Sequence, residues 1–145
     1  MARRVFFSFH YQRDVWRANC IRNCHIVQGT AAAGFQDASL WEKAKKEGDA
    51  AVKRLIDAAL VGTTVTVVLI GSQTAGRKYI NYEIDKSMER GNGIIGIHIH
   101  GIKDQTGKTD VKGDVPVKLT KGGYRVYEAF DSSKFGGWVE AAAKA

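Results

Sequence analysis

The sequence predicts an α/β domain built on a parallel sheet, and two observations favour this class. Residues 64–70, Thr-Val-Thr-Val-Val-Leu-Ile, are apolar almost throughout, as expected of a central parallel strand that is buried on both faces. Short apolar runs also alternate with segments of helical spacing, in the order strand, helix, helix, strand, helix, strand. Right-handed crossovers then produce a flavodoxin-like sheet with helices on both faces.

The first elements follow from the N-terminal sequence. Residues 5–9 form a short aromatic and β-branched run that predicts a buried strand. Residues 10–14 are polar and indicate a turn. A helix is expected from about residue 14 to residue 23, because apolar and small residues recur there at helical spacing.

The middle of the chain holds the clearest patterns. Residues 28–36 are rich in Gly and Ala and indicate a loop or weak strand. Residues 39–42, Ser-Leu-Trp-Glu, form a capping box, and an amphipathic helix is expected from there to about residue 60. After the strand at 64–70, residues 71–76 form a loop, residues 79–90 a helix, and residues 94–99 another strand.

The C-terminal part has weaker signals. Residues 103–121 are polar and indicate a long loop, residues 124–127 a short strand, and residues 135–143 a final helix. We expect one domain over residues 1–145, with a core at about 3–103 and a variable part at 104–145, because 145 residues suit a single core.

The charge and composition of the chain indicate which kinds of partner it binds. The formal net charge is +7, which favours anionic partners, but the basic residues are scattered. The densest cluster, at residues 43–46, is flanked by glutamates and indicates a solvated helix face rather than a nucleic-acid interface. We find no signal peptide and no apolar run of membrane-spanning length, so a cytoplasmic protein without membrane or nucleic-acid partners is expected.

The two cysteines, Cys20 and Cys24, lie four residues apart and share one helix face. They could join His25 in a metal site. We favour two small residues facing the core, because no second Cys/His pair stands at ligand spacing. No metal is therefore predicted, and the lack of a disulfide framework suits a reducing compartment.

Ligands of open parallel sheets bind outside the carboxyl ends of the strands. Residues 8–14, 71–77 and 98–103 are the loops at that edge, and Glu83 follows the second of them. Among aromatic and apolar neighbours its pKa could be raised, or it could accept the hydroxyls of a ribose. The alternative is a first-turn glutamate that complements the helix dipole.

Other polar residues near this edge have ordinary explanations as well. Ser8, His10 and Asp14 could form a nucleophile set, but no nucleophile elbow surrounds Ser8. The loop at 71–74 could contact a phosphate through its N–H groups, although it is not a Walker loop. His98 and His100 point to one face of a strand and could bind metal or fill a buried edge. Trp41 could stack on a nucleobase or pack in the core.

Several segments together resemble TIR domains, most closely the TIR-like branch of the bacterial Thoeris antiphage system. They are Arg-Val-Phe-Phe-Ser-Phe-His-Tyr at residues 4–11, the segment at 35–42, Val-Leu-Ile-Gly-Ser-Gln-Thr at 68–74, Arg-Lys-Tyr-Ile-Asn-Tyr-Glu-Ile at 77–84, and the segment at 92–98. The resemblance covers about residues 3–103, and its motifs keep the family's order and spacing.

This resemblance implies a TIR fold and an enzyme that cleaves NAD at the nicotinamide–ribose bond. NAD is then a substrate, and no cofactor is needed. The family's catalytic glutamate maps onto Glu83. Substrate-binding positions map onto six other residues of this sequence: Phe9, His10, Asp37, Trp41, Ser72 and Arg77. In the Thoeris branch the product is a cyclic ADP-ribose isomer, which activates a partner effector in antiviral defence, and the TIR protein self-assembles on activation.

Three functions therefore compete. The first is an NAD-cleaving signal synthase, whose oxocarbenium-like transition state one carboxylate could stabilise. The second is a TIR interaction module without activity, against which a chain of this length with no second domain to recruit argues mildly. The third is a flavodoxin-like nucleotide-binding protein, which would be expected to carry a Gly-rich phosphate loop.

Overall fold

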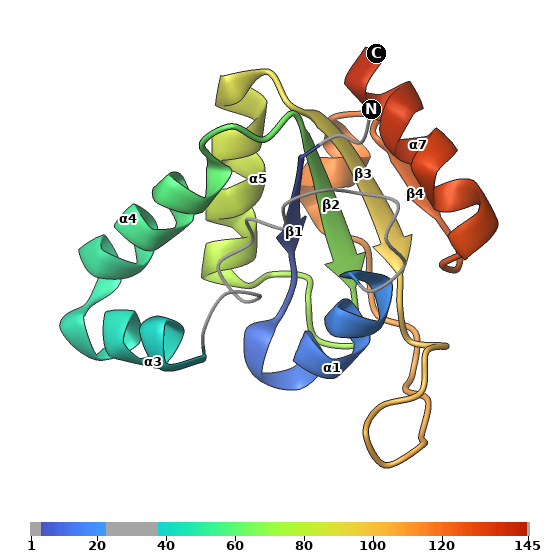
Figure 1. Cartoon of the computed structure of the whole chain (residues 1–145), viewed down its shortest axis with the longest axis horizontal. Coiled ribbons are helices and arrows are strands. Elements are labelled where there is room, and N and C mark those ends of the chain that lie inside the picture. The colour runs from blue at the N-terminus through green and yellow to red at the C-terminus, as the bar shows by residue number, and fades with distance from the viewer. Residues whose placement is uncertain (1–3, 23–37, 145) are drawn as a thin grey trace.

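The computed structural model describes residues 4–22 and 38–144. Within these residues four strands form one parallel sheet in the order β1-β2-β3-β4 (Figure 1). They are β1 (Val5–Ser8), β2 (Val65–Ile70), β3 (Gly93–His98) and β4 (Arg125–Tyr127). In the β1–β2 register Ser8 pairs with Val68. The predicted α/β class with a parallel sheet is confirmed.

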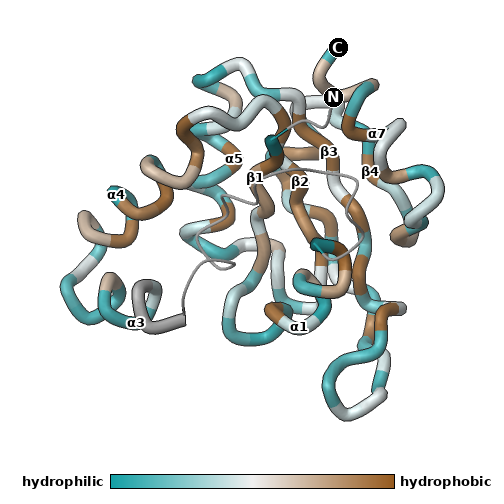
Figure 2. Tube along the Cα trace, in the orientation of Figure 1, coloured by the Kyte–Doolittle hydropathy of each residue, from teal (hydrophilic) through white to brown (hydrophobic). Residues whose placement is uncertain are grey.

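Helices cover both faces of this sheet. On one face, α1 (Tyr11–Arg22) and α7 (Ser132–Lys144) pack their buried residues against alternate side chains of the strands. On the other face lie α3 (Ala38–Glu47), α4 (Asp49–Leu60), α5 (Lys78–Arg90) and the short α6 (Val117–Lys121). Figure 2 shows the strands as the apolar centre of the domain. The alternating direction of strand side chains explains both cores.

The predicted helix over residues 39–60 is wrong in one respect, because two helices occupy this stretch. Gly48 separates α3 from α4 with φ of 113° and ψ of 179°, a conformation that side chains disfavour. The chain turns there, as Figure 1 shows. The capping box depends on Ser39, whose side chain is outside the described residues, as are residues 28–36.

The N-terminal helix starts earlier than predicted. Residues 10–14 were expected to form a turn, but α1 begins at Tyr11. The Asp14 N–H donates to the carbonyl of His10 at 2.9 Å, which is the first bond of the helical ladder. The helix thus begins directly at the end of β1.

Two corrections concern the remaining helices. The polar stretch at 103–121 includes α6, which forms because Leu119 is completely buried against the sheet. The last helix begins at Ser132, earlier than expected, and the Asp131 carboxylate accepts from the Ser133 N–H at 2.9 Å. None of the described helices is long and apolar enough to cross a bilayer.

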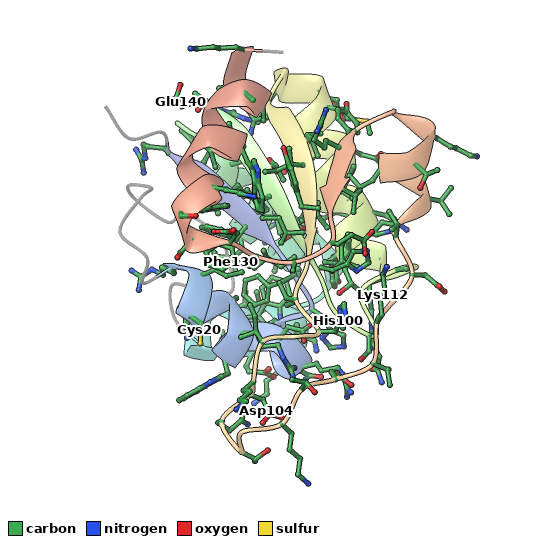
Figure 3. All side chains as sticks on the ribbon, turned by 90° about the vertical axis from the view of Figure 1, so that its right-hand side faces the viewer. Cys20, His100, Asp104, Lys112, Phe130 and Glu140 are labelled. Atoms are coloured by element: carbon green, nitrogen blue, oxygen red, sulfur yellow. The ribbon has the colours of Figure 1, made fainter. Side chains whose placement is uncertain are left out.

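The preferred interpretation of the first cysteine was also wrong. Cys20 is exposed on the outer side of α1, with a free thiol (Figure 3). The helix turns Ala18 and Ile21 to the core instead, since both are completely buried. Cys24 lies outside the described residues.

Candidate active site

The carboxyl ends of the strands meet at the edge where α1 begins (Figure 1). A pocket of about 230 Å³ opens there, between the start of α1, helix α3 and the start of α5. Its lining combines aromatic and basic side chains: Phe9, His10, Tyr11, Gln12, Trp41, Lys45, Arg77, Lys78, Tyr79 and Ile80. The volume is below the range of pockets that enclose a whole drug-sized ligand, so part of a dinucleotide suits it better.

One wall of the pocket is a row of aromatic rings. The ring centroids of Tyr11 and Trp41 lie 5.8 Å apart, and those of Trp41 and Tyr79 lie 6.1 Å apart at 81°. Trp41 is only 8% exposed, so it packs in the core and also lines the pocket. The packing interpretation of Trp41 is confirmed, and its stacking on a nucleobase stays a prediction. Such a wall suits a flat ring that stacks or meets it edge-on.

The rim of the pocket is cationic. Arg77 bonds through Nε to the Gln73 carbonyl at 3.2 Å, which holds the guanidinium beside the pocket. Lys45 contributes a second charge from α3. The pKa of His10 is lowered, first by burial and then by the Arg77 charge, which favours a neutral imidazole. Positive charge at this rim therefore comes from lysine and arginine, which suits a phosphate group.

Glu83 is buried beside this pocket, with 4% of its surface exposed. The Ser8 hydroxyl donates to Glu83 Oε1 at 2.6 Å. Burial raises the pKa of Glu83 to about 8, and the Ser8 hydrogen bond acts in the opposite direction. A carboxyl group with a raised pKa in an apolar setting is typical of catalytic carboxylates.

Glu83 does not itself line the pocket in this structure. Tyr79 and Ile80, which do, precede it by four and three residues on the same face of α5. On the strand side, Phe9 lines the pocket and directly follows Ser8. The bonded pair of Ser8 and Glu83 is therefore next to residues that line the pocket, and Glu83 is one helical turn from Tyr79 along α5.

The other predicted site residues divide into three groups. Phe9, His10, Trp41 and Arg77 all line the pocket. Ser72 does not: its hydroxyl donates to Asp110 Oδ2 at 2.9 Å and accepts from Arg13 Nε at the same distance. Asp37 lies outside the described residues.

A second buried polar cluster lies behind the β2–α5 loop. Asp14 is completely buried, 3.5 Å from Arg17 Nη1, and burial raises its pKa to about 6 against the effect of Arg17. Arg17 also donates to the carbonyls of Ile102 and Lys108, at 2.6 and 3.1 Å. Asp14 therefore does not join a nucleophile set with Ser8 and His10, because it is buried beside Arg17. The cluster ties the loop around Asp104, labelled in Figure 3, to α1.

The histidine pair does not form a metal centre with further ligands. His98 and His100 meet edge to face with ring centroids 5.8 Å apart. Among the residues that the structure describes, no three His, Cys, Asp or Glu side chains converge as metal ligands. The pKa of His98 is lowered, chiefly by burial, which favours a neutral ring within the fold.

Sequence reasoning missed several residues of the site. Tyr11, Lys45 and Tyr79 line the pocket, and Ser8 bonds to Glu83. Ser8 carried a signal, because it is the single polar residue in the run Val-Phe-Phe-Ser-Phe. A buried hydroxyl needs a hydrogen-bond partner. The sequence could not identify that partner, because Glu83 lies 75 positions away in the chain.

Comparison with known proteins decides the family. The family described as Thoeris protein ThsB, TIR-like domain, matches residues 6–104, which is more than half of the chain. This chain belongs to the ThsB family of TIR-like domains. The match includes Phe6–Ser8 of β1 and the whole of α5 and β3, and so both Ser8 and Glu83. The predicted resemblance to the Thoeris branch of TIR domains is confirmed.

A curated relative supports the same assignment. The chain is 55% identical over 118 residues to a Bacillus cereus (strain MSX-D12) protein named "Putative cyclic ADP-D-ribose synthase ThsB1". The aligned part covers 80% of this ThsB-family chain and 62% of the relative, so the chain spans less than two thirds of that protein's length.

Proposed function

We propose that this ThsB-family protein cleaves NAD between nicotinamide and ribose and closes the remaining ADP-ribose into a cyclic product. The observation that carries the proposal is the buried Glu83 carboxyl, one helical turn along α5 from Tyr79 in an aromatic pocket with a cationic rim. The relative's name, a cyclic ADP-D-ribose synthase, supports the same reaction class.

The pocket suits one half of NAD. The aromatic wall at Trp41 and Tyr79 offers stacking or edge contacts to a flat heterocycle. Arg77 and Lys45 stand at the rim, where a diphosphate linking the two halves would lie. A volume of about 230 Å³ leaves the second half of the dinucleotide outside the pocket.

Glu83 supplies the charge that the bond cleavage needs. The bond between the nicotinamide nitrogen and ribose C1 breaks, and its electron pair leaves with neutral nicotinamide, so no strong acid is required. Positive charge develops on the ribose, as in glycoside hydrolysis. A carboxylate beside C1 stabilises that charge and can accept the ribose hydroxyls.

Ring closure follows when a nucleophile of the same molecule reaches C1. A hydroxyl of the ADP-ribose unit bonds to C1 and releases its proton, whereas attack by water would give linear ADP-ribose. Closure therefore depends on excluding water and on holding the two ends of the molecule together. The largely buried surroundings of Glu83 favour that exclusion.

The test is direct. Purified protein is incubated with NAD, and nicotinamide and the remaining product are separated by chromatography and weighed by mass spectrometry. We expect nicotinamide and a product one water lighter than ADP-ribose, both lost in Glu83→Gln. Full activity of Glu83→Gln would contradict the role of this carboxylate, and ADP-ribose alone would contradict cyclisation.

The wider role follows from the same family. We propose that the cyclic product activates a partner effector during phage infection, that the protein self-assembles when it is triggered, and that it works in the cytoplasm. Lysate from infected cells should then switch on nicotinamide release by the wild type but not by Glu83→Gln. If triggered wild-type protein assembles and still leaves NAD intact, it is an interaction module.

A further inference from the structure

Ser8 carries a hydroxyl in an apolar environment, with one hydrogen-bond partner among the side chains that the structure describes. It is completely buried, between Phe7 and Phe9, which are 1% and 7% exposed. A buried hydroxyl without a hydrogen bond destabilises the fold, so its partner matters. That partner is Glu83 Oε1, at 2.6 Å, a length typical of a hydroxyl donating to a carboxylate.

Two rigid elements hold this contact in place. Ser8 pairs with Val68 inside the parallel sheet, and strand alternation turns its side chain to the same face as Phe6, toward α5. On α5, Glu83 lies between Ile80 and Ile84, both buried against the sheet. Groups on packed strands and helices are held more accurately than groups on loops.

We propose that Ser8 is a positioning residue for the NAD-cleaving reaction. Its hydroxyl holds Glu83 Oε1, so that the carboxylate meets the ribose in a single orientation and in the ionised form. This inference rests on the proposed function, because it assumes that Glu83 stabilises charge on the ribose. Ser8 itself touches neither substrate nor reacting atoms and acts through Glu83.

Ionisation is the second half of this role. A hydroxyl that donates to a carboxylate favours the ionised form and thereby opposes the effect of burial. No charged group among the described residues adds to the pKa shift of Glu83, which burial and Ser8 account for. That holds for the charged and titratable groups on α5 itself, which are Lys78, Tyr79, Tyr82, Asp85, Lys86, Glu89 and Arg90. It also holds for those on neighbouring elements, which include His10, Lys45, Asp49, Lys53, Arg54, Asp57, His98 and Lys118.

The experiment compares Ser8→Ala and Ser8→Thr with the wild type in NAD cleavage from pH 5.5 to 9.5. In Ser8→Ala we expect kcat near neutral pH to fall about 10-fold to 100-fold, the loss expected for a hydrogen bond to a charged group. The pH midpoint of kcat should rise by about one unit, and KM should stay within about twofold. Ser8→Thr keeps the hydroxyl and should restore the midpoint.

A matched control separates positioning from packing. Thr66 on β2 and Ser87 on α5 form a buried hydroxyl pair between the same sheet and helix, at 2.6 Å. Thr66→Val removes that bond and the one from Asn92 Nδ2 to Thr66, but it leaves the Ser87 hydroxyl to donate to the backbone carbonyl of Glu83 and does not alter the Glu83 carboxyl. It should therefore lower the melting temperature while the pH midpoint stays at the wild-type value. If Ser8→Ala behaves like Thr66→Val, its role is only structural and the proposal is overturned.

A measurement that does not depend on activity separates the proposed role of Ser8 from the proposed NAD-cleaving function. The side-chain carboxyl ¹³C resonance of Glu83, assigned by its loss in Glu83→Gln, is titrated by NMR in the wild type and in Ser8→Ala. We expect a midpoint about one unit higher in Ser8→Ala. An unchanged midpoint overturns the role of Ser8 even in an inactive sample. A shifted midpoint with full activity of Glu83→Gln refutes the proposed function instead.

Discussion

The Tyr79 hydroxyl donates to Asp49 Oδ1 at 2.9 Å, and this bond ties the start of α5 to the start of α4 beside the pocket. Lys78 and Lys53 also pair with Asp49, at 2.7 and 3.1 Å. Three side chains thus converge on one carboxylate. They hold the Tyr79 ring against Trp41, as part of the pocket wall.

Asp49→Ala should weaken nucleotide binding by about 3-fold to 10-fold. The Tyr79 ring loses its hydrogen bond to Asp49, so binding must then pay the entropy of ordering that ring in the pocket wall. The dissociation constant for NAD is measured by calorimetric titration of Glu83→Gln with and without Asp49→Ala, so that NAD is not cleaved during the measurement. Asp57→Ala is the matched control, since Asp57 accepts from Tyr82 at 2.7 Å in the same way but away from the pocket. Equal losses in the two variants would contradict a role for Asp49 in the pocket.

The raised pKa of Glu83 predicts a pH-dependent stability. Because the folded-state pKa, about 8, lies above the ordinary value of 4.5, the protonated carboxyl is compatible with burial and the ionised one is penalised. The contribution is fully present below pH 4.5 and is lost as pH rises through 8. Relative to Glu83→Gln, the free energy of unfolding of the wild type should fall by roughly 3–5 kcal/mol between pH 5 and pH 9.5.

Urea unfolding of both proteins at the two pH values measures this difference. The Gln variant retains a carbonyl acceptor for Ser8, so it changes charge with little change in shape. Stability curves that run parallel from pH 5 to pH 9.5 would show that Glu83 titrates at its ordinary pKa, and the buried carboxyl would lose its link to catalysis.

Gly71→Ala should destabilise the fold by about 2 kcal/mol, in the range observed for overpacked interiors. A Cβ at this position would stand 2.3 Å from Oδ2 of Asp14, a completely buried side chain that lies 3.5 Å from Arg17 Nη1 through its other oxygen. Gly101→Ala provides the control, since its Cβ would meet no atom within 4 Å. Thermal unfolding measures the melting temperatures of both variants, and Gly71→Ala should melt at the lower temperature. Equal melting temperatures would contradict the close contact between Gly71 and Asp14.

The cationic rim predicts a salt-dependent affinity for NAD. Arg77→Ala and Lys45→Ala should each weaken binding by about 3-fold to 10-fold at low salt, and the difference from wild type should shrink as ionic strength rises. Lys43→Ala, on the same helix as Lys45 but outside the pocket lining, should bind as the wild type does. An equal loss in Lys43→Ala would indicate a general effect of net charge.

Local patterns were sufficient for much of this fold. The apolar run of β2 and the amphipathic α5 were predicted within one residue at their ends. Predictions failed where a distant contact decided the structure. α6 forms because the sheet buries Leu119, and the helix over residues 39–60 breaks at Gly48, whose positive φ has no signature beyond the glycine itself.

The candidate site divides in the same way. The resemblance to TIR domains implied that Phe9, His10 and Arg77 share a site, and the rule for parallel strands predicted only that their loops lie at one edge of the sheet. The pocket includes all three. The same resemblance implied Ser72, which instead bonds to Asp110, a residue 38 positions away in the sequence.

By itself the sequence determined the fold class, the family and the carboxylate worth testing, because hydrophobic periodicity and motif order are local properties of the chain. Only the tertiary structure decided the surroundings of that carboxylate. The pKa of Glu83 depends on its burial between α5 and the strands and on the hydrogen bond from Ser8. Both effects require the folded chain, because Ser8 and Glu83 are 75 residues apart in the sequence.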